Sequence, residues 1–191
     1  YLADCGLPKE RTYVTGSPMA EVLHNNLAEI EASDVHRRLC LEKGKYILLS
    51  AHREENIDTE KNFLSLFTAI NKMAEKYDMP ILYSCHPRSR NRLAISGFQF
   101  DSRVIQHEPL GFHDYNCLQM NAFAVVSDSG TLHEESSFFT SVGHPFPPVC
   151  IRTSTERPEA IDKGDFIIAG IDEKSLLQAV DTAVELCKDD Q

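Results

Sequence analysis

The chain has 191 residues, of which 42% are hydrophobic and 25% charged, and its formal net charge at pH 7 is −10. This composition is typical of a soluble globular protein with one good-sized core. The negative charge argues against general nucleic-acid binding, and no apolar run is long enough to span a bilayer, so neither nucleic acid nor a membrane is expected as a partner.

Six cysteines are scattered along the chain without a Cys-x-x-Cys pair. This pattern is typical of buried thiols in a reducing cytoplasm rather than of disulfides or a zinc site. We therefore expect a cytoplasmic protein with no metal and no cofactor. The sequence begins at Tyr1 rather than at Met, and we expect it to be a piece of a longer protein.

The first third of the sequence predicts a leading strand and two helices. Residues 11–15 are β-prone and are followed by Gly-Ser-Pro. Ser17 is suited to cap a helix over residues 18–30, whose apolar positions follow the helical period. A shorter helix is predicted over residues 34–41, starting at a Ser or Asp cap.

From residue 46 onward, apolar runs of strand length alternate with helices. The predicted strands are residues 46–50, 80–84, 104–105, 122–126, 149–151 and 166–169. The predicted helices cover residues 59–77, 113–120, the residues after 131, and 172–187, whereas 85–90 is predicted to be a loop. This alternation indicates right-handed βαβ crossovers, and so a Rossmann-like doubly wound parallel sheet of the α/β class.

Polar clusters follow several of these strands. They lie around His52, His86, Ser129 and Arg157. Because ligands bind at the carboxyl ends of parallel strands, where the strand order reverses, we expect these clusters to converge on one edge of the sheet.

The stretch 125–135 predicts a short strand, a polar turn with one Gly, and a helix whose first turn carries two carboxylates. Unpaired backbone N–H groups and the macrodipole make such a helix start a site for anions. The turn Ser129–Thr131 is therefore a candidate to hold a diphosphate, with Arg157 or Arg152 supplying a guanidinium fork. The structural alternative is an ordinary capped helix.

Two further side chains complete a candidate nucleotide site. Glu135, on the first helical turn, has two acceptor oxygens suited to ribose hydroxyls. His52 is suited to donate to a phosphate or to protonate a leaving phosphate. A structural loop histidine and an exposed ion pair are the alternatives. The sequence contains no Gly-x-Ser-x-Gly elbow, Gly-x-Gly-x-x-Gly turn, P-loop or zinc-protease helix.

Three ordered blocks resemble the non-hydrolysing UDP-N-acetylglucosamine 2-epimerase family. They are Ser-Ala-His-Arg-Glu-Glu-Asn at 50–56, Ser-Asp-Ser-Gly through Glu-Glu at 127–135, and Thr-Glu-Arg-Pro-Glu-Ala at 155–160. Residues 14–18 and 85–87 resemble the same family. The resemblance implies one half of a two-domain fold like that of type B glycosyltransferases, with the active site between the halves.

The resemblance implies that residues 1–191 are a single UDP-binding domain, the C-terminal half of an enzyme whose N-terminal half is missing. It also implies an isomerase that converts UDP-GlcNAc to UDP-ManNAc, or a related UDP-sugar, by elimination and re-addition of UDP. Surface polysaccharide biosynthesis and a homodimer of the full-length protein are implied as well. The proton-transfer carboxylates are expected in the missing half, so the isolated chain is expected to be inactive.

The same resemblance assigns roles to individual residues. His52 is implied to be catalytic, near the diphosphate, and Tyr115 to lie beside the uracil. The implied UDP-binding residues are Ser129, Gly130, Thr131, Glu135, Arg157 and Tyr115. Secondary contacts are assigned to Arg53, His86, Arg88 and Arg152.

Two questions stay open at the level of sequence. Thr131 stands where the family usually has a second glycine, so the sugar is not fixed. The main alternative function is the nucleotide-binding half of a two-domain UDP-sugar glycosyltransferase, although the block at 155–160 favours the epimerase.

Overall fold

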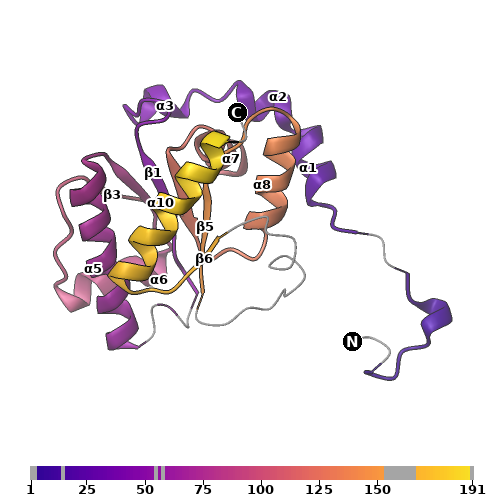
Figure 1. The fold of residues 1–191 in the computed structure, drawn as a ribbon, viewed down its shortest axis with the longest axis horizontal. Helices are drawn as coiled ribbons and strands as arrows, with labels where there is room; N and C mark the ends of the chain where they lie inside the picture. Colours follow the sequence, from indigo (N-terminus) through magenta and orange to yellow (C-terminus); the bar gives the residue numbers. More distant parts are fainter. Residues whose placement is uncertain (1–3, 14–15, 54–55, 57–58, 153–166, 190–191) are drawn as a thin grey trace.

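A computed structural model describes residues 4–13, 16–53, 56, 59–152 and 167–189 (Figure 1). At its centre lies a six-stranded sheet in the order β3-β2-β1-β4-β5-β6, with every neighbouring pair parallel. The strands are β1 (Ile47–Ser50), β2 (Ile81–Ser84), β3 (Val104–His107), β4 (Ala124–Ser127), β5 (Pro148–Ile151) and β6 (Ile167–Ala169). The predicted doubly wound parallel sheet is confirmed.

Helices cover both faces of this sheet. The core cluster on one face contains residues of α5 (Glu60–Tyr77), α6 (Pro87–Ser96) and α10 (Glu173–Asp189). The cluster on the other face contains residues of α1 (Met19–Asn25), α2 (Leu27–Glu31), α3 (Val35–Arg38), α7 (Phe112–Gln119) and α8 (Leu132–Ser141). None of the described helices is both long enough and apolar enough to cross a bilayer.

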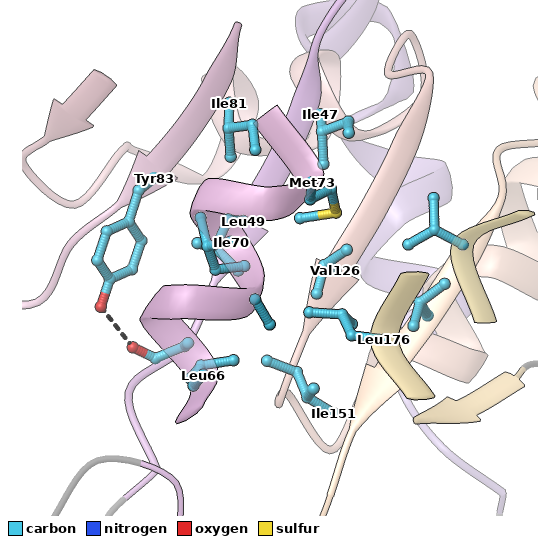
Figure 2. Close-up of a cluster of buried hydrophobic side chains, with 14 of the residues drawn as sticks. Ile47, Leu49, Leu66, Ile70, Met73, Ile81, Tyr83, Val126, Ile151 and Leu176 are labelled. Atoms are coloured by element: carbon cyan, nitrogen blue, oxygen red, sulfur yellow. Dashed lines mark hydrogen bonds between the residues drawn. The ribbon is translucent and has the colours of Figure 1, made fainter. Parts of the chain in front are cut away.

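The central strands are buried on both faces, which is why their sequences are continuously apolar. In β1, Ile47 and Leu49 join the cluster under α5, whereas Leu48 joins the cluster under α7 and α8. Figure 2 shows the first of these clusters, in which side chains of α5 such as Ile70 pack over the sheet. At its edge, the Tyr83 hydroxyl donates to the Ala51 carbonyl at 2.8 Å, satisfying a buried polar group.

Helix α5 follows its predicted range closely because both of its ends carry strong local signals. The Thr59 side chain caps the start by accepting from the Asn62 amide at 3.2 Å. Asp78 ends the helix in the left-handed region at φ 48°. Between the caps, Phe63 and Phe67 face the core.

The predicted leading strand over residues 11–15 is wrong where the structure describes it. Lys9–Arg11 forms a short 3₁₀ helix, η1, whose last turn is closed by the Thr12 amide donating to the Lys9 carbonyl at 3.1 Å. Residues 14–15 lie outside the described part. The segment extends away from the body of the molecule, so none of the described strands lies beside it to supply ladder hydrogen bonds (Figure 1).

The two predicted N-terminal helices are more broken than their apolar periodicity suggests. Residues 18–30 form α1 and α2, separated at Asn26, whose backbone leaves the helical region. The second prediction, residues 34–41, shrinks to α3. The Asp34 carboxylate binds Arg38 Nε at 2.6 Å and makes no cap to the helix, and Cys40 adopts a positive φ of 53° soon after the helix ends.

Helix α6 was not predicted, because residues 85–90 were expected to form a loop. The structure begins α6 at Pro87, a residue that is well tolerated at a helix start. Of its apolar residues, Leu93 reaches the core whereas Ile95 is 88% exposed. The sequence therefore lacks the apolar stripe that normally identifies a surface helix.

Candidate functional site

The strand order reverses between β1 and β4, which lie side by side at the centre of the sheet. Their parallel register pairs Ser50 with Ser127, the last residue of each strand. The segments that follow, beginning at residues 51 and 128, therefore start next to each other at the carboxyl edge. In doubly wound sheets this switch point is where ligands bind.

Asp128 joins these two loops. Its side chain is fully buried, and its Oδ2 accepts from the backbone amides of His52 (2.9 Å) and Arg53 (2.8 Å). The same oxygen accepts from Asn56 Nδ2 at 3.2 Å. The backbone amide of Asp128 donates to the Ser50 carbonyl at 3.0 Å. One carboxylate oxygen thus fixes the path of the loop after β1.

Two guanidinium groups flank Gly130 in the turn before α8. Arg53 Nε donates to the Asp128 carbonyl at 2.7 Å, and Arg152 Nη2 donates to the Ser129 carbonyl at 3.4 Å. A Cβ atom placed on Gly130 would lie 3.6 Å from Arg53 Nη2 and 3.8 Å from Arg152 Nη2. Positive charge therefore converges beside the start of a helix, a combination that favours an anionic group.

The carboxylate of Glu135 is fixed from both sides. Thr131 Oγ1 donates to its Oε1 at 2.6 Å, and Gln119 Nε2 donates to its Oε2 at 2.7 Å. Ser129 Oγ lies 2.9 Å from Thr131 Oγ1, so the hydroxyls of the turn form a chain that leads to the carboxylate. Ser129, Thr131 and Glu135 were all predicted to belong to one site, and the structure brings them together.

His52 stands over the buried carboxylate. Its Nδ1 lies 3.4 Å from Asp128 Oδ1 and 3.5 Å from Ser50 Oγ. The side chain is 48% exposed. The imidazole is therefore held at its Nδ1 side by groups at the strand ends while the rest of the ring faces outward.

Tyr115, on α7, belongs to the same cluster. Burial raises the pKa of its hydroxyl, and the negative charge of Glu135 raises it further, while hydrogen bonding with Ser50 and Ser127 acts in the opposite direction. These neighbours are the ends of β1 and β4 and the first turn of α8. The hydroxyl of Tyr115 thus lies among the groups that support the site.

The remaining predicted residues follow a different strand of the sheet or lie outside the described residues. His86 is exposed and follows β2, which lies on the far side of β1 from β4. Arg88 is the second residue of α6. Arg157 lies outside the described residues.

Three supporting residues were not predicted to act at the site: Asp128, Asn56 and Gln119. Asp128 and Asn56 stand inside two of the three sequence blocks that the resemblance identified, so a signal for both was present. Gln119 is a buried amide at the last residue of α7, and no sequence signal distinguishes it. In the described ranges, no group of three or more His, Cys, Asp or Glu side chains is arranged to hold a metal ion.

Comparison with known proteins identifies the family. The sequence model of the family described as UDP-N-acetylglucosamine 2-epimerase matches residues 1–191. The chain belongs to the UDP-N-acetylglucosamine 2-epimerase family. A curated relative of that name from Methanococcus maripaludis is 30% identical over 186 residues, which cover 92% of this chain and 49% of the relative.

Solved structures of the UDP-N-acetylglucosamine 2-epimerase family share the fold. The enzyme from Rickettsia bellii superposes with a TM-score of 0.83 at 36% identity, covering 97% of this chain and 48% of that one. The enzyme from Methanocaldococcus jannaschii, determined in complex with UDP-GlcNAc and UDP, gives a TM-score of 0.82 at 27% identity over 96% of this chain and 51% of that one. The chain therefore spans about half the length of these family members.

Proposed function

We propose that this chain is the UDP-binding half of a non-hydrolysing UDP-sugar 2-epimerase, and that residues 1–191 form one domain. Its substrate is UDP-GlcNAc or a related UDP-2-acetamido sugar. Ser129, Gly130 and Thr131 hold the diphosphate at the start of α8. The relative crystallised with UDP-GlcNAc and UDP supports this choice of ligand.

The observation that carries the proposal is the convergence of Arg53 and Arg152 on Gly130, beside a fixed Glu135. Gly130 has no side chain, so a ligand is able to approach its backbone closely. The two guanidinium groups beside it suit a doubly charged ligand. A carboxylate one helical turn away suits the vicinal hydroxyls of a ribose. The spacing of these groups along a single helix start matches the order of diphosphate and ribose in a nucleotide.

The other assigned residues complete the proposed site. His52 is the catalytic residue beside the diphosphate, and Tyr115 lies near the uracil. Arg157 adds a further positive charge at the diphosphate. His86 and Arg88 belong to a secondary contact region one strand away from the switch point.

The proposed chemistry is elimination followed by re-addition. A proton leaves C2 of the sugar, the bond between C1 and the diphosphate oxygen breaks, and a glycal and UDP result. Addition of UDP to C1, with protonation of C2 from the opposite face, gives the epimer. UDP must remain bound between the steps because its loss would convert epimerisation into hydrolysis. The carboxylates that move the C2 proton belong to a part of the enzyme that this chain does not include.

Ligand binding tests the assignment of the cationic pair. In isothermal titration calorimetry, Arg152→Ala is expected to weaken binding of UDP by about 10- to 100-fold, because a charged hydrogen bond to phosphate is worth roughly 1.5–3 kcal/mol. Arg37→Ala is the matched control, because Arg37 is 79% exposed and pairs with Asp34 on α3. Equal affinities of the two variants would contradict the proposal.

Product analysis tests the reaction class. The intact protein, incubated with UDP-GlcNAc in D₂O without an acceptor, is expected to produce the C2 epimer with deuterium at C2, detected by NMR. A UDP-sugar glycosyltransferase would leave the sugar unchanged until an acceptor is added. The 191-residue chain alone is expected to bind UDP weakly and to produce no epimer.

We further propose a cytoplasmic enzyme that supplies sugars for surface polysaccharides and acts as a homodimer at full length. The six cysteines are all free thiols, which supports a reducing compartment. A curated relative from Pseudomonas aeruginosa, 27% identical over 139 residues, acts on a diacetamido uronic acid linked to UDP, which supports amino sugars as the substrate class. Light scattering of the intact protein tests the dimer.

A further inference from the structure

We propose that Asp128 is a positioning residue for His52, whose Nδ1–H donates to Asp128 Oδ1 so that Nε2 faces the bound ligand. The role given to Nε2 rests on the proposed function, because the ligand there is the diphosphate of a UDP-sugar. The pairing of the two side chains is independent of that function.

The first argument is that one oxygen of the Asp128 carboxylate, Oδ1, lacks a hydrogen-bond donor in the described part of the chain. Oδ2 of Asp128 already accepts three hydrogen bonds, from two backbone amides and the Asn56 side chain. Oδ1 is buried and has no hydrogen-bond partner among the described residues. A buried carboxylate oxygen without a donor is costly, so a donor close to it is strongly favoured. His52 Nδ1 lies 3.4 Å from this oxygen and is able to carry the required proton.

The second argument concerns the alternative arrangement. Nδ1 also lies 3.5 Å from Ser50 Oγ, whose hydroxyl is able to donate to an unprotonated Nδ1. In that arrangement the lone pair of Nδ1 would face the carboxylate oxygen, and two acceptors would repel each other. With the proton on Nδ1, the hydrogen bond to the carboxylate is charge-assisted and is therefore stronger than a neutral bond to serine. The Nδ1–H tautomer is favoured on both counts.

The guanidinium groups near the pair donate to main-chain carbonyl oxygens and not to Asp128 Oδ1. The guanidinium of Arg53 donates to the main-chain carbonyl of Asp128, and that of Arg152 donates to the Ser129 carbonyl. Both cations therefore lie on the turn before α8, where the ligand phosphates are proposed to bind. Asp128 therefore lies at the Nδ1 side of the imidazole, whereas the two arginines are placed to bind the ligand.

For the reaction, the pairing determines which ring nitrogen of His52 faces the ligand. A carboxylate at Nδ1 fixes the orientation of the ring, so that Nε2 points away from the protein interior. An N–H at Nε2 is then placed to donate a hydrogen bond to the diphosphate oxygen that gains negative charge as its bond to C1 breaks. Asp128 does not touch the ligand; it sets which nitrogen of His52 does.

The tautomer of His52 gives a direct test in the 191-residue chain. With ¹⁵N-labelled histidine, long-range ¹H–¹⁵N correlations distinguish Nδ1–H from Nε2–H at a pH where the ring is neutral, and His52→Gln identifies the signal. The wild-type chain is expected to show Nδ1–H. An Nε2–H tautomer in the wild type would overturn the proposal, even if no variant could be purified.

Asp128→Asn is the informative variant. The oxygen that accepts from three donors must remain an oxygen, so the new amide NH₂ would face Nδ1 and switch His52 to the Nε2–H tautomer. Ser50→Ala is the matched control, because it removes the other neighbour of Nδ1 and is expected to keep Nδ1–H. An unchanged tautomer in Asp128→Asn, or a switch in Ser50→Ala, would refute the pairing.

Kinetics of the intact protein separate positioning from a structural role. Asp128→Asn is expected to lower kcat by at least about 100-fold, the usual scale of acid–base assistance, with little change in KM. A variant that loses substrate affinity together with kcat would contradict the positioning role. If the wild-type protein binds no UDP, the proposed function fails while the tautomer experiment still decides the pairing.

Discussion

At the scale of single residues, the site depends on side chains that support other side chains. Asp128 accepts hydrogen bonds from backbone amides of the loop after β1, and Gln119 donates to the Glu135 carboxylate. The sequence predicted groups such as His52 and Ser129, because their types and spacing are typical of the proposed nucleotide site. It did not predict these two supports: the block at 127–135 contains Asp128 without indicating its partners, and the contact of Gln119 with Glu135 joins two different helices.

Removing the Asp128 carboxylate is expected to destabilise the fold. In Asp128→Ala, the amides of His52 and Arg53 and the Asn56 side chain lose their acceptor, and the free energy of unfolding is expected to fall by about 3 kcal/mol. Urea denaturation measures this change. Asp128→Asn keeps an acceptor oxygen and is expected to lose much less. Equal stabilities of the two variants would show that the three donors find other partners.

At the scale of elements, predictability follows the strength of the local signal. Strands β1, β2 and β4 were predicted because strands buried on both faces have continuous apolar sequences. Helix α6 was missed because it lacks an apolar stripe. The strand predicted over 11–15 was wrong for the described residues 11–13, because local β propensity forms no strand without a neighbour to pair with.

The junction between α5 and β3 should make stability depend on pH. Arg103 binds Asp101 and also Asp78, the residue that ends α5, and hydrogen bonding with Arg103 lowers the pKa of Asp101 to about 2. A carboxyl group with a pKa below its unfolded value of about 4 stabilises the fold above that pH and loses this effect as the pH falls towards about 2.

The variant Asp101→Asn lacks this pH-dependent contribution. The difference in unfolding free energy between wild type and Asp101→Asn is therefore expected to shrink as the pH falls from about 4 to about 2, measured by urea denaturation. Glu21→Gln, at an exposed position on α1, serves as the control and is expected to give a nearly constant difference. A difference for Asp101→Asn that is equally constant would contradict the assignment.

At the scale of the whole molecule, the chain consists of a sheet with two covered faces and an N-terminal segment that extends away from it (Figure 1). The alternation of strands and helices predicted a parallel sheet, but the order 3-2-1-4-5-6 comes only from the structure. Strand order depends on the side of β1 on which each later strand is added, and no local sequence pattern encodes that side.

Because the core clusters start with α1, the segment before it should be dispensable for stability. Deleting residues 1–11, which removes η1, is expected to leave the midpoint of thermal unfolding unchanged. A longer deletion that also removes α1, with the fully buried Leu23, is expected to lower the midpoint, because truncating even one buried leucine to alanine costs about 2–5 kcal/mol. Circular dichroism melts measure both. Equal losses in the two truncations would show that the first residues contribute to the fold.

The hydrogen bonds between Asp128 and the loop after β1 also determine when, during synthesis, that loop becomes anchored. The His52 amide and its acceptor are separated by 76 positions in the chain. At a synthesis rate of roughly 5–20 residues per second, the histidine leaves the ribosome roughly 4 to 15 seconds before the aspartate that anchors it. During synthesis, the loop after β1 is therefore anchored only after β4 has paired with β1, and a shorter nascent chain lacks the proposed nucleotide site.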